Sequence, residues 1–356
     1  MYDIAIIGLG PAGATLARLL DSRFSVAVID KKRTDGRGFQ KPCGGLLAAD
    51  AQKALSRFDL ALPKDVLVDP QIFSVRTIDV STRRTRYYQR FYINLDRHRF
   101  DLWLRSLIPS HVEIFDDSTL THIEKAGEGY TLSFVKDGRV HRIGARYLVG
   151  ADGAHSMVRH FLYPRKQIRQ YLSIQQWFHD THQKPFFSCV FDPGITDCYS
   201  WSMSKDGYFI FGGAYPKKQC RSLFEEQKKR LAGLGFSFGE PIKTEACLVL
   251  RPKRPRDFST GKQGAFLIGE AGGFISPSSL EGISGAIHTG YLLSQVLNKG
   301  AQNPCAAYRS KTRRLRLKLY LKVLKSPFMY WPPLRRLVMA SGLNSIDMAG
   351  EGERGQ

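Results

Sequence analysis

The sequence predicts an α/β protein with two domains and a basic helical segment near its C-terminus, and three observations lead to this fold class. The chain opens with an apolar strand, a glycine-rich turn, a helix and a second apolar strand, which is the order of a parallel βαβ unit. Aromatic and β-branched runs in residues 170–250 predict a largely antiparallel sheet in a second domain of α+β type, which strands at 72–80 and 86–93 are expected to join. The length of 356 residues suits about two domains.

The glycine-rich turn near the N-terminus has the spacing of a dinucleotide-binding motif. After a strand at residues 2–7, the turn reads Gly8, Leu9, Gly10, Pro11, Ala12 and Gly13. The first glycine allows a tight turn, the second leaves room for a pyrophosphate, and the third lets the next helix lie close to the strand. The start of that helix offers free N–H groups and a positive dipole end to phosphates. We therefore predict a Rossmann-like domain.

An acidic residue at the end of the second strand supports this prediction. The strand at residues 24–29 ends in Asp30, which Lys31 follows. A carboxylate about 20 residues beyond the glycines accepts hydrogen bonds from an adenosine ribose. Because strand, turn, helix, strand and acid occur in this order, the motif is more specific than a glycine pattern by itself.

Two later segments repeat the pattern of an apolar strand followed by glycine and an acidic residue. The first contains Asp152 and Gly153, and the second contains Gly269 and Glu270. We therefore expect a discontinuous nucleotide-binding domain. Its three parts are predicted at residues 1–70, 96–165 and 256–300, the substrate domain at residues 71–95 and 166–255, and a basic helical region with a tail at residues 301–356.

Three predicted helices lie next to these segments. Asp96 can cap an amphipathic helix that begins at Arg97. A later helix begins near Gly282 and Ile283, and its N-terminus would suit a developing negative charge. A further helix is expected at about residues 46–58, after a glycine-rich loop.

Composition argues against several other classes of protein. The chain has no run of about 18 apolar residues, so no segment is expected to span a membrane. The N-terminus shows neither a basic region nor a cleavage site, so we expect a cytoplasmic protein. None of the six cysteines forms a C-x-x-C pair, so we expect free thiols and no bound metal.

The net charge of +21 predicts an anionic partner. A lipid surface or a phosphorylated substrate would fit, whereas no known nucleic-acid module accompanies the charge, and we expect no nucleic-acid partner. Cations and apolar residues interleave within residues 306–345. This pattern fits either an interfacial helix pair on anionic lipid at the inner face of the membrane, or a capping helix whose cations stay in water. The oligomeric state stays undetermined.

Together these segments resemble the group of flavoproteins that includes aromatic hydroxylases and geranylgeranyl reductases. The resemblance covers nearly the whole chain and implies an FAD-binding domain, with Asp30 on the ribose. Arg97 matches the group's arginine at a helix start, and Asp152 matches its Asp-Gly segment. Gly269 and Glu270 match a Gly-Asp segment that holds the ribityl chain, with Glu in place of Asp. The residues expected to contact FAD are Gly8, Gly10, Pro11, Ala12, Gly13, Asp30, Lys31, Cys43, Gly44, Gly45, Leu46, Arg97, Asp152, Gly269, Glu270, Gly282 and Ile283.

Two segments favour the reductase branch, and the whole chain is similar to the CbrA-type flavoproteins of bacteria. Around Cys43, the run Pro42-Cys43-Gly44-Gly45-Leu46 is similar to a Cys-Gly-Gly segment beside the isoalloxazine. This favours an active-site position for Cys43 over that of a small buried filler. The run Tyr199-Ser200-Trp201-Ser202-Met203 resembles a Tyr-x-Trp-x-Phe segment that lines a lipid pocket, although its methionine and a missing proline depart from the pattern. The expected pocket walls, each of which also fits ordinary core packing, are Tyr199, Trp201, Phe209, Phe211 and Phe274.

The function that this resemblance implies is an FAD-dependent oxidoreductase. We expect it to reduce carbon–carbon double bonds of an isoprenoid or other lipid-like substrate by hydride transfer from reduced FAD, with Cys43 as the candidate catalytic residue. NAD(P)H or a reduced electron carrier would supply the electrons. Two alternatives remain open: an FAD-dependent monooxygenase of an apolar or aromatic substrate, and a flavin-binding protein that interacts with a membrane surface without turnover.

Overall fold

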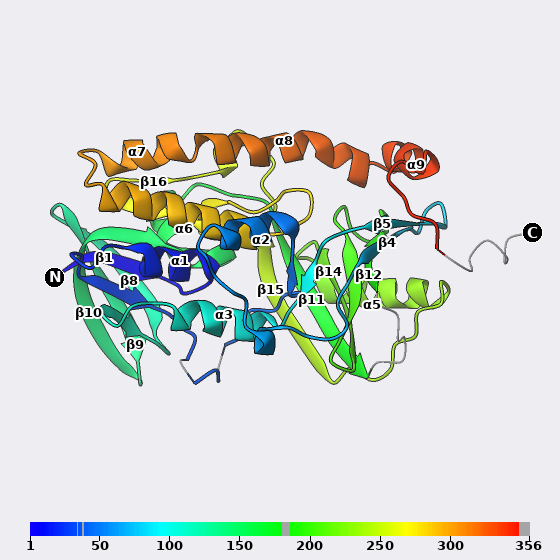
Figure 1. The fold of residues 1–356 in the computed structure, drawn as a ribbon, viewed down its shortest axis with the longest axis horizontal. Helices are drawn as coiled ribbons and strands as arrows, with labels where there is room; N and C mark the ends of the chain where they lie inside the picture. The colour runs from blue at the N-terminus through cyan, green and yellow to red at the C-terminus, as the bar shows by residue number, and fades with distance from the viewer. Residues whose placement is uncertain (34, 38, 180–185, 349–356) are drawn as a thin grey trace, which may run out of the picture.

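The computed structural model describes residues 1–33, 35–37, 39–179 and 186–348. Two β-sheets lie beside each other along the long axis of the molecule, and a long helix crosses above both (Figure 1). The predicted α/β fold class is confirmed. The domain limits given above stay a prediction, and their last part, from residue 349 on, lies outside the described residues.

The first sheet has eight strands within the described residues and contains the nucleotide-binding motif. Its strand order is β16-β17-β10-β1-β2-β7, with β9 paired to β10 and β8 paired to β9. The four pairs from β17 to β7 are parallel, and the others are antiparallel. The strands are β1 (Tyr2–Ile7), β2 (Val26–Ile29), β7 (Val112–Phe115), β8 (Thr119–Ala126), β9 (Gly129–Lys136), β10 (Arg139–Gly150), β16 (Gly261–Lys262) and β17 (Ala265–Leu267).

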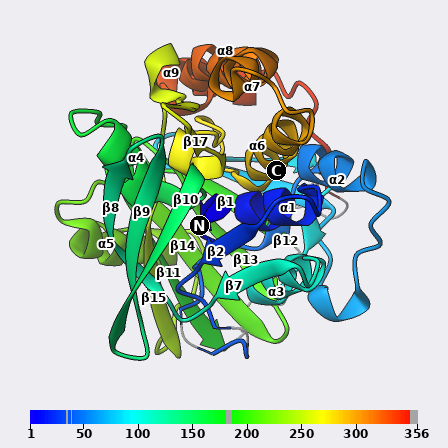
Figure 2. The same ribbon diagram turned by 90° about the vertical axis from the view of Figure 1, so that its left-hand side faces the viewer.

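Both faces of the parallel strands are covered, which explains why β1 and β2 are apolar throughout (Figure 2). One face packs against helices α1 (Pro11–Leu19), α2 (Ala49–Ser56), α3 (Arg97–Ser106) and α6 (Ile283–Asn298). The other face packs against β8, β9 and the short helix α4 (Met157–Leu162). Helix α6 contacts α1 closely, because a β-carbon at Gly290 would lie 2.6 Å from the carbonyl oxygen of Ala12.

The second sheet has seven strands in the part of the chain that is described, in the order β15-β11-β14-β13-β12-β4-β5. All neighbouring strands are antiparallel except β12 and β4. The strands are β4 (Ser74–Asp79), β5 (Arg84–Gln89), β11 (Gln170–His179), β12 (Phe186–Phe191), β13 (Ser200–Lys205), β14 (Tyr208–Tyr215) and β15 (Lys243–Leu250). As predicted, the early hairpin β4–β5 joins this sheet. Helix α5 (Cys220–Ala232) covers one face.

A two-stranded ribbon connects the sheets and corrects one prediction. Strand β3 (Leu46–Leu47) pairs with β6 (Ile93–Asn94), so helix α2 begins only at Ala49 rather than at residue 46. The ribbon holds the chain extended where the sequence pattern predicted helix. Short 3-10 turns complete the path: η1 (Lys64–Val66), η2 (Gly153–His155), η3 (Pro255–Asp257) and η4 (Gly269–Gly272).

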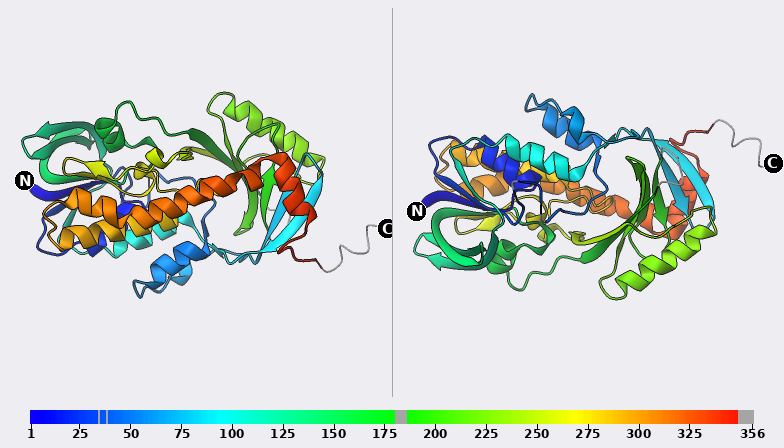
Figure 3. Two further views of the ribbon diagram at one scale, coloured as in Figure 1. Left: turned by 90° about the horizontal axis from the view of Figure 1, so that it is seen from above. Right: turned by 90° about the horizontal axis from the view of Figure 1, so that it is seen from below.

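Three helices form the C-terminal layer: α7 (Pro304–Lys311), α8 (Arg313–Tyr330) and α9 (Pro332–Ala340). Helix α8 runs from above the first sheet to above the second (Figure 3). At its far end, Nε of Arg335 in α9 lies 2.9 Å from Oδ2 of Asp79 in β4, and both side chains are buried. Among the described helices, none combines the length and the apolar character needed to cross a membrane.

Candidate functional site

The glycine-rich turn has the geometry that its spacing predicts. Gly8 has φ +98°, and a β-carbon there would lie 2.7 Å from the carbonyl oxygen of Ala151. A β-carbon at Gly13 would lie 1.9 Å from the carbonyl oxygen of Gly8, so the helix can approach the turn only with glycine at this position. Gly10 differs from both, because a β-carbon there would meet nothing within 4 Å. This open space lies at the N-terminus of α1, where free N–H groups attract phosphate.

Asp30 is a buried acceptor at the end of β2. Its side chain is 5% exposed, and Oδ2 has no hydrogen-bond partner among the described residues. Burial raises the pKa of its carboxyl, although Lys32, Arg105 and two backbone N–H groups act in the opposite direction. A ribose hydroxyl can donate to this oxygen. The neighbouring Lys31 places its ammonium 3.5 Å from the ring centroid of Phe39.

The Asp-Gly segment follows β10 directly, beside the glycine turn. Oδ2 of Asp152 accepts a hydrogen bond from the N–H of Val158 at 3.3 Å, and Oδ1 is buried without a partner in the described chain. Burial raises the pKa of this carboxyl, against hydrogen bonds from Ser156 and nearby N–H groups. Asp152 therefore offers a second unsatisfied acceptor near the first segment.

Gly269 brings the third segment against the first. A β-carbon there would lie 2.9 Å from the β-carbon of Ala12, and φ is +57°. The next residue, Glu270, accepts hydrogen bonds from Nζ of Lys41 at 2.8 Å and from the N–H of Leu250 at 2.9 Å. Each carboxylate oxygen thus has a protein partner, so a ribityl hydroxyl would share an oxygen that already accepts a hydrogen bond.

Arg97 and Cys43, which the sequence suggested separately, lie together. Asp96 caps α3 as predicted, because its Oδ1 accepts the N–H groups of the second and third helix residues. The guanidinium of Arg97 donates to Oδ1 of Asp101 at 2.9 Å and also contacts the side chain of Cys43. Burial works to lower the pKa of Arg97, but Asp101 and Cys43 outweigh it and the pKa is raised. Arg97 and Lys32 in turn overcome the effect of burial on Asp101 and lower its pKa to about 2.

The double glycine lets the turn after Cys43 pack directly on β13. A β-carbon at Gly44 would lie 2.9 Å from Cε of Met203. Gly45 has φ +66°, and a β-carbon there would lie 2.3 Å from the carbonyl oxygen of Leu95. Leu46 then packs, partly buried, on the same apolar cluster as Met203.

Alternate residues of β13 and the residue before it face this turn and the loop before α6. The hydroxyl of Tyr199 donates to the carbonyl of Ser279, and Met203 lies against Gly44. Trp201 is 9% exposed, and its indole Nε1 is a buried donor without a partner in the described residues. A ligand oxygen can accept from it. Of the predicted wall residues, Trp201 therefore lies at the Cys-Gly-Gly turn, and Tyr199 lies next to it against the loop before α6.

The other three predicted wall residues lie elsewhere, and this part of the prediction is corrected. Phe209 and Phe211 point to the opposite face of the sheet, where they pack with Phe224 of α5. Phe274 is fully buried and packs with Phe258 beneath α8. Each therefore has the ordinary core role that the sequence left open.

Lys205 is a site residue that sequence reasoning missed. It is 4% exposed, and its Nζ donates to the carbonyl of Leu95 at 2.6 Å beneath the Cys-Gly-Gly turn. The signal was present, because Lys205 continues the alternation of Tyr199, Trp201 and Met203 along one strand face.

The loop before α6 closes the site from the third segment. Gly282 is the N-cap residue of α6, and Ile283 is its first residue. The hydroxyl of Tyr92 donates to Glu281 at 2.9 Å, and Nε of Arg251 donates to the carbonyl of Pro277 at 3.1 Å. These contacts fix the loop that leads into α6, and a helix N-terminus is a position that favours negative charge.

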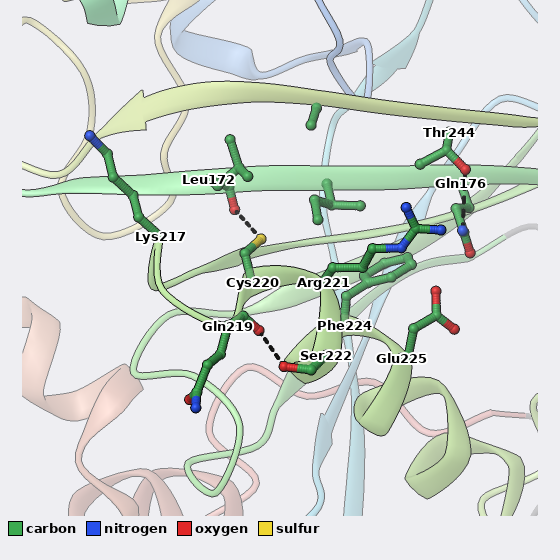
Figure 4. A pocket seen from close by; sticks show the side chains of 12 residues that line it. Leu172, Gln176, Lys217, Gln219, Cys220, Arg221, Ser222, Phe224, Glu225 and Thr244 are labelled. Carbon is green, nitrogen blue, oxygen red and sulfur yellow. Dashed lines mark hydrogen bonds between the residues drawn. The ribbon is translucent and has the colours of Figure 1, made fainter.

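A separate cavity of about 590 Å³ lies on the far face of the second sheet (Figure 4). Leu172 of β11 and Phe224 of α5 line it, with Lys217 and Arg221 at its side. It is distinct from the site at Cys43, because the sheet lies between them. No cluster of three or more metal-ligating side chains occurs among the residues described.

The geometry and the comparisons with known proteins lead to the same class. The open space at Gly10 and the unsatisfied oxygen of Asp30 fit an FAD molecule, and residues 109–215 match the family model described as FAD binding domain. The protein is therefore an FAD-binding flavoprotein of the oxidoreductase class, and FAD is confirmed as its cofactor.

The family follows from a close relative. The chain is 54% identical to protein CbrA of Escherichia coli O157:H7 over 346 residues. This match covers 97% of this chain and 98% of the relative. The chain belongs to the CbrA family.

Solved structures share the fold at low sequence identity. A geranylgeranyl bacteriochlorophyll reductase-like protein from Thermoplasma acidophilum has a TM-score of 0.77 at 16% identity, over 95% of this chain and 98% of its own. A probable FAD-dependent monooxygenase from Pseudomonas aeruginosa has a TM-score of 0.70 at 16% identity, over 96% of this chain and 99% of its own. The fold is thus shared by proteins named for different reactions.

Proposed function

We propose that the protein reduces carbon–carbon double bonds of an isoprenoid or other lipid-like substrate. The observation that carries this proposal is the contact between the Cys-Gly-Gly turn and β13, where Met203 and Trp201 meet Gly44. It joins a thiol, an apolar wall and an unsatisfied indole N–H in one place. A buried apolar surface of this kind suits a hydrocarbon chain and excludes water.

The residues of this chain bind and orient the reactants. The space at Gly10 and the N-terminus of α1 hold the pyrophosphate, and Asp30 holds the ribose. The N-terminus of α6 stabilises negative charge at the site. When bound, FAD supplies hydride chemistry. Cys43 lies on the turn that faces the substrate, and NAD(P)H or a reduced carrier supplies the electrons.

One anaerobic experiment tests the proposal. The FAD-loaded protein is reduced with dithionite, mixed with geranylgeranyl diphosphate, and analysed for reoxidised flavin and for product mass. We expect reoxidation without oxygen and a product that has gained two hydrogens for each double bond reduced. Reoxidation only after oxygen is admitted, together with a hydroxylated product, would establish the monooxygenase alternative. Flavin that no combination of donor and lipid can cycle would establish a binding role instead.

We further propose that the protein works at an anionic membrane surface, through helix α8. Within the described chain, Leu319 is the one buried residue of this helix. Its outer side carries an apolar stripe at intervals of three and four residues, which is helical spacing. The stripe consists of Leu317, Leu321, Leu324 and Phe328, which are 47–57% exposed, and Trp331 continues it.

Cations flank the stripe on α8, which is the pattern of an interfacial helix. Arg314, Lys318 and Lys325 are exposed beside it. A helix that only capped the domain would bury its leucines, whereas these four apolar side chains point outward. Anionic lipid complements both parts of this surface, because acyl chains receive the stripe and headgroups receive the cations.

A further inference from the structure

Lys205 is a buried cation that takes no part in the reaction proposed above. It ends β13 and is 4% exposed. Its Nζ lies 2.6 Å from the carbonyl oxygen of Leu95 and 3.5 Å from that of Gly45. A β-carbon at Gly45 would lie 2.5 Å from this Nζ, so the ammonium fills the space directly beneath the Cys-Gly-Gly turn.

The ammonium joins three parts of the molecule. The N–H of Leu95 donates to the carbonyl of Gly45 at 2.9 Å, so the two carbonyls that Lys205 contacts lie side by side at one end of the connecting ribbon, directly before β3 and directly after β6. Lys205 itself belongs to the second sheet. The side chain therefore ties the turn and the start of α3 to the wall that carries Trp201 and Met203.

A charge at this position costs free energy, which an apolar side chain would avoid. Burial lowers the pKa of Lys205 to about 8, although Cys43, Asp96 and Asp206 act in the opposite direction. These are the ionisable groups that face it, from the turn, from the cap of α3 and from the β13–β14 hairpin. Arg97 reaches the same thiol from the first turn of α3. A methionine would fill similar volume without desolvating a charge, so the ammonium calls for a functional explanation.

We propose that Lys205 is a positioning residue that clamps the Cys43–Gly45 turn onto β13 and so fixes the place of the Cys43 side chain beside the substrate. This inference rests on the reductase function proposed above. The ammonium holds the carbonyls by charge-assisted hydrogen bonds, and the neutral amine holds them more weakly. The clamp therefore loosens as the pH rises through about 8.

Hydrogen exchange of the FAD-loaded protein tests the clamp without any substrate. The measured quantity is the protection factor of the Gly45 and Leu95 amides at pH 7 and pH 9, after correction for intrinsic exchange. In the wild type we expect protection to fall by about fivefold, the difference between a charge-assisted and a neutral hydrogen bond. In Lys205→Arg the charge persists, so protection should change little between the two values. In Lys205→Met the Gly45 and Leu95 amides should be weakly protected at both pH 7 and pH 9.

The exposed Lys217, in the loop between β14 and α5, supplies the matched control, and Lys217→Met should follow the wild type. The proposal fails if wild-type protection is the same at pH 7 and pH 9, or if Lys205→Met is as well protected as the wild type at pH 7. If Lys205→Met does not fold, the comparison of wild type with Lys205→Arg still decides. Because exchange needs no turnover, a failed reductase assay would leave this test intact.

Discussion

Cys43 and Arg97 lie in contact although 53 intervening residues separate them, and Asp101 fixes the arginine from the other side. The thiol thus faces a fixed cation at the edge of the FAD-binding half. This arrangement supports the proposed active-site position of Cys43, and replacing the residue tests that proposal.

Replacing Cys43 with alanine should leave FAD bound and slow turnover. The turn is held by Gly44, Gly45 and Lys205, so the cofactor site does not depend on the thiol. We expect kcat to fall by about tenfold or more, as for a group that moves a proton or orients the substrate. Stopped-flow reoxidation of the reduced protein by geranylgeranyl diphosphate measures it, and Cys305→Ala is the control. Unchanged kinetics would return Cys43 to a filler role.

Replacing Gly10 with valine should abolish FAD binding. The side chain would occupy the open space at the N-terminus of α1, and the local φ of −70° tolerates valine without strain. The Kd for FAD should rise by about 100-fold or more, measured by quenching of flavin fluorescence. Gly239→Val is the control, because a β-carbon there also meets nothing within 4 Å and the residue is far from the motif in sequence. A yellow, FAD-loaded Gly10→Val protein would refute the assignment.

Neutralising two cations beside the stripe on α8 should weaken binding to anionic vesicles. The double change Arg314→Gln and Lys318→Gln removes two charges from an exposed helix face, each worth about 1 kcal/mol near such a surface. Sedimentation with phosphatidylserine vesicles at several salt concentrations measures the loss. Arg139→Gln and Arg142→Gln remove the same charge from a distant hairpin and should have little effect. Wild-type protein that ignores these vesicles would end the membrane proposal.

The ion pairs that Asp101 forms with Arg97 and Lys32 predict that the fold loses stability in acid. Arg97 and Lys32 hold the folded-state pKa of Asp101 at about 2, below its ordinary value of 3.8. The pair therefore stabilises the fold above about pH 4, and this contribution is lost as the pH falls through 4 toward 2. Asp101→Asn should be less stable at pH 6 and should lose less stability on acidification. Urea unfolding of the wild type and of Asp101→Asn at pH 6, 4 and 3 measures the free energy of unfolding. If that free energy depends on pH in the same way in the two proteins, the prediction is wrong.

Breaking the buried pair between Arg335 and Asp79 should destabilise the fold strongly. Arg335→Met removes the cation beside a fully buried carboxylate that keeps its hydrogen bonds from Ser81, and we expect the free energy of unfolding to fall by about 3–5 kcal/mol. Adding Asp79→Asn to the same chain should restore part of the loss, because it removes the unpaired charge. Thermal unfolding of the two variants measures this, and a double variant no more stable than the single one would point to lost packing instead.

The sequence predicted the nucleotide-binding half in detail because its constraints are local. Gly8, Gly13 and Asp30 act within one strand–turn–helix–strand unit, where spacing alone sets geometry. The contact between Cys43 and Arg97 was not predictable in the same way, because it depends on how two distant segments pack.

The misplaced wall residues have a specific cause. The hairpin between β13 and β14 turns through two residues and pairs Lys205 with Tyr208. Side chains that lie opposite each other share a face, so odd-numbered residues of β13 face the same way as even-numbered residues of β14. Phe209 and Phe211 therefore point away from Trp201. Aromatic character suggested a common wall, but the register across the turn decides the face.

The contact of Gly269 with Ala12, and of α6 with α1, has a consequence for the order of events during synthesis. The first strand leaves the ribosome long before α6, yet the cofactor cradle needs both. We therefore expect a nascent chain stalled before residue 269 to retain no FAD, and one released after α6 has emerged to acquire it. On this expectation the flavin loads late in maturation, because Gly269 and Ala12, which lie against each other in the fold, are far apart in the sequence.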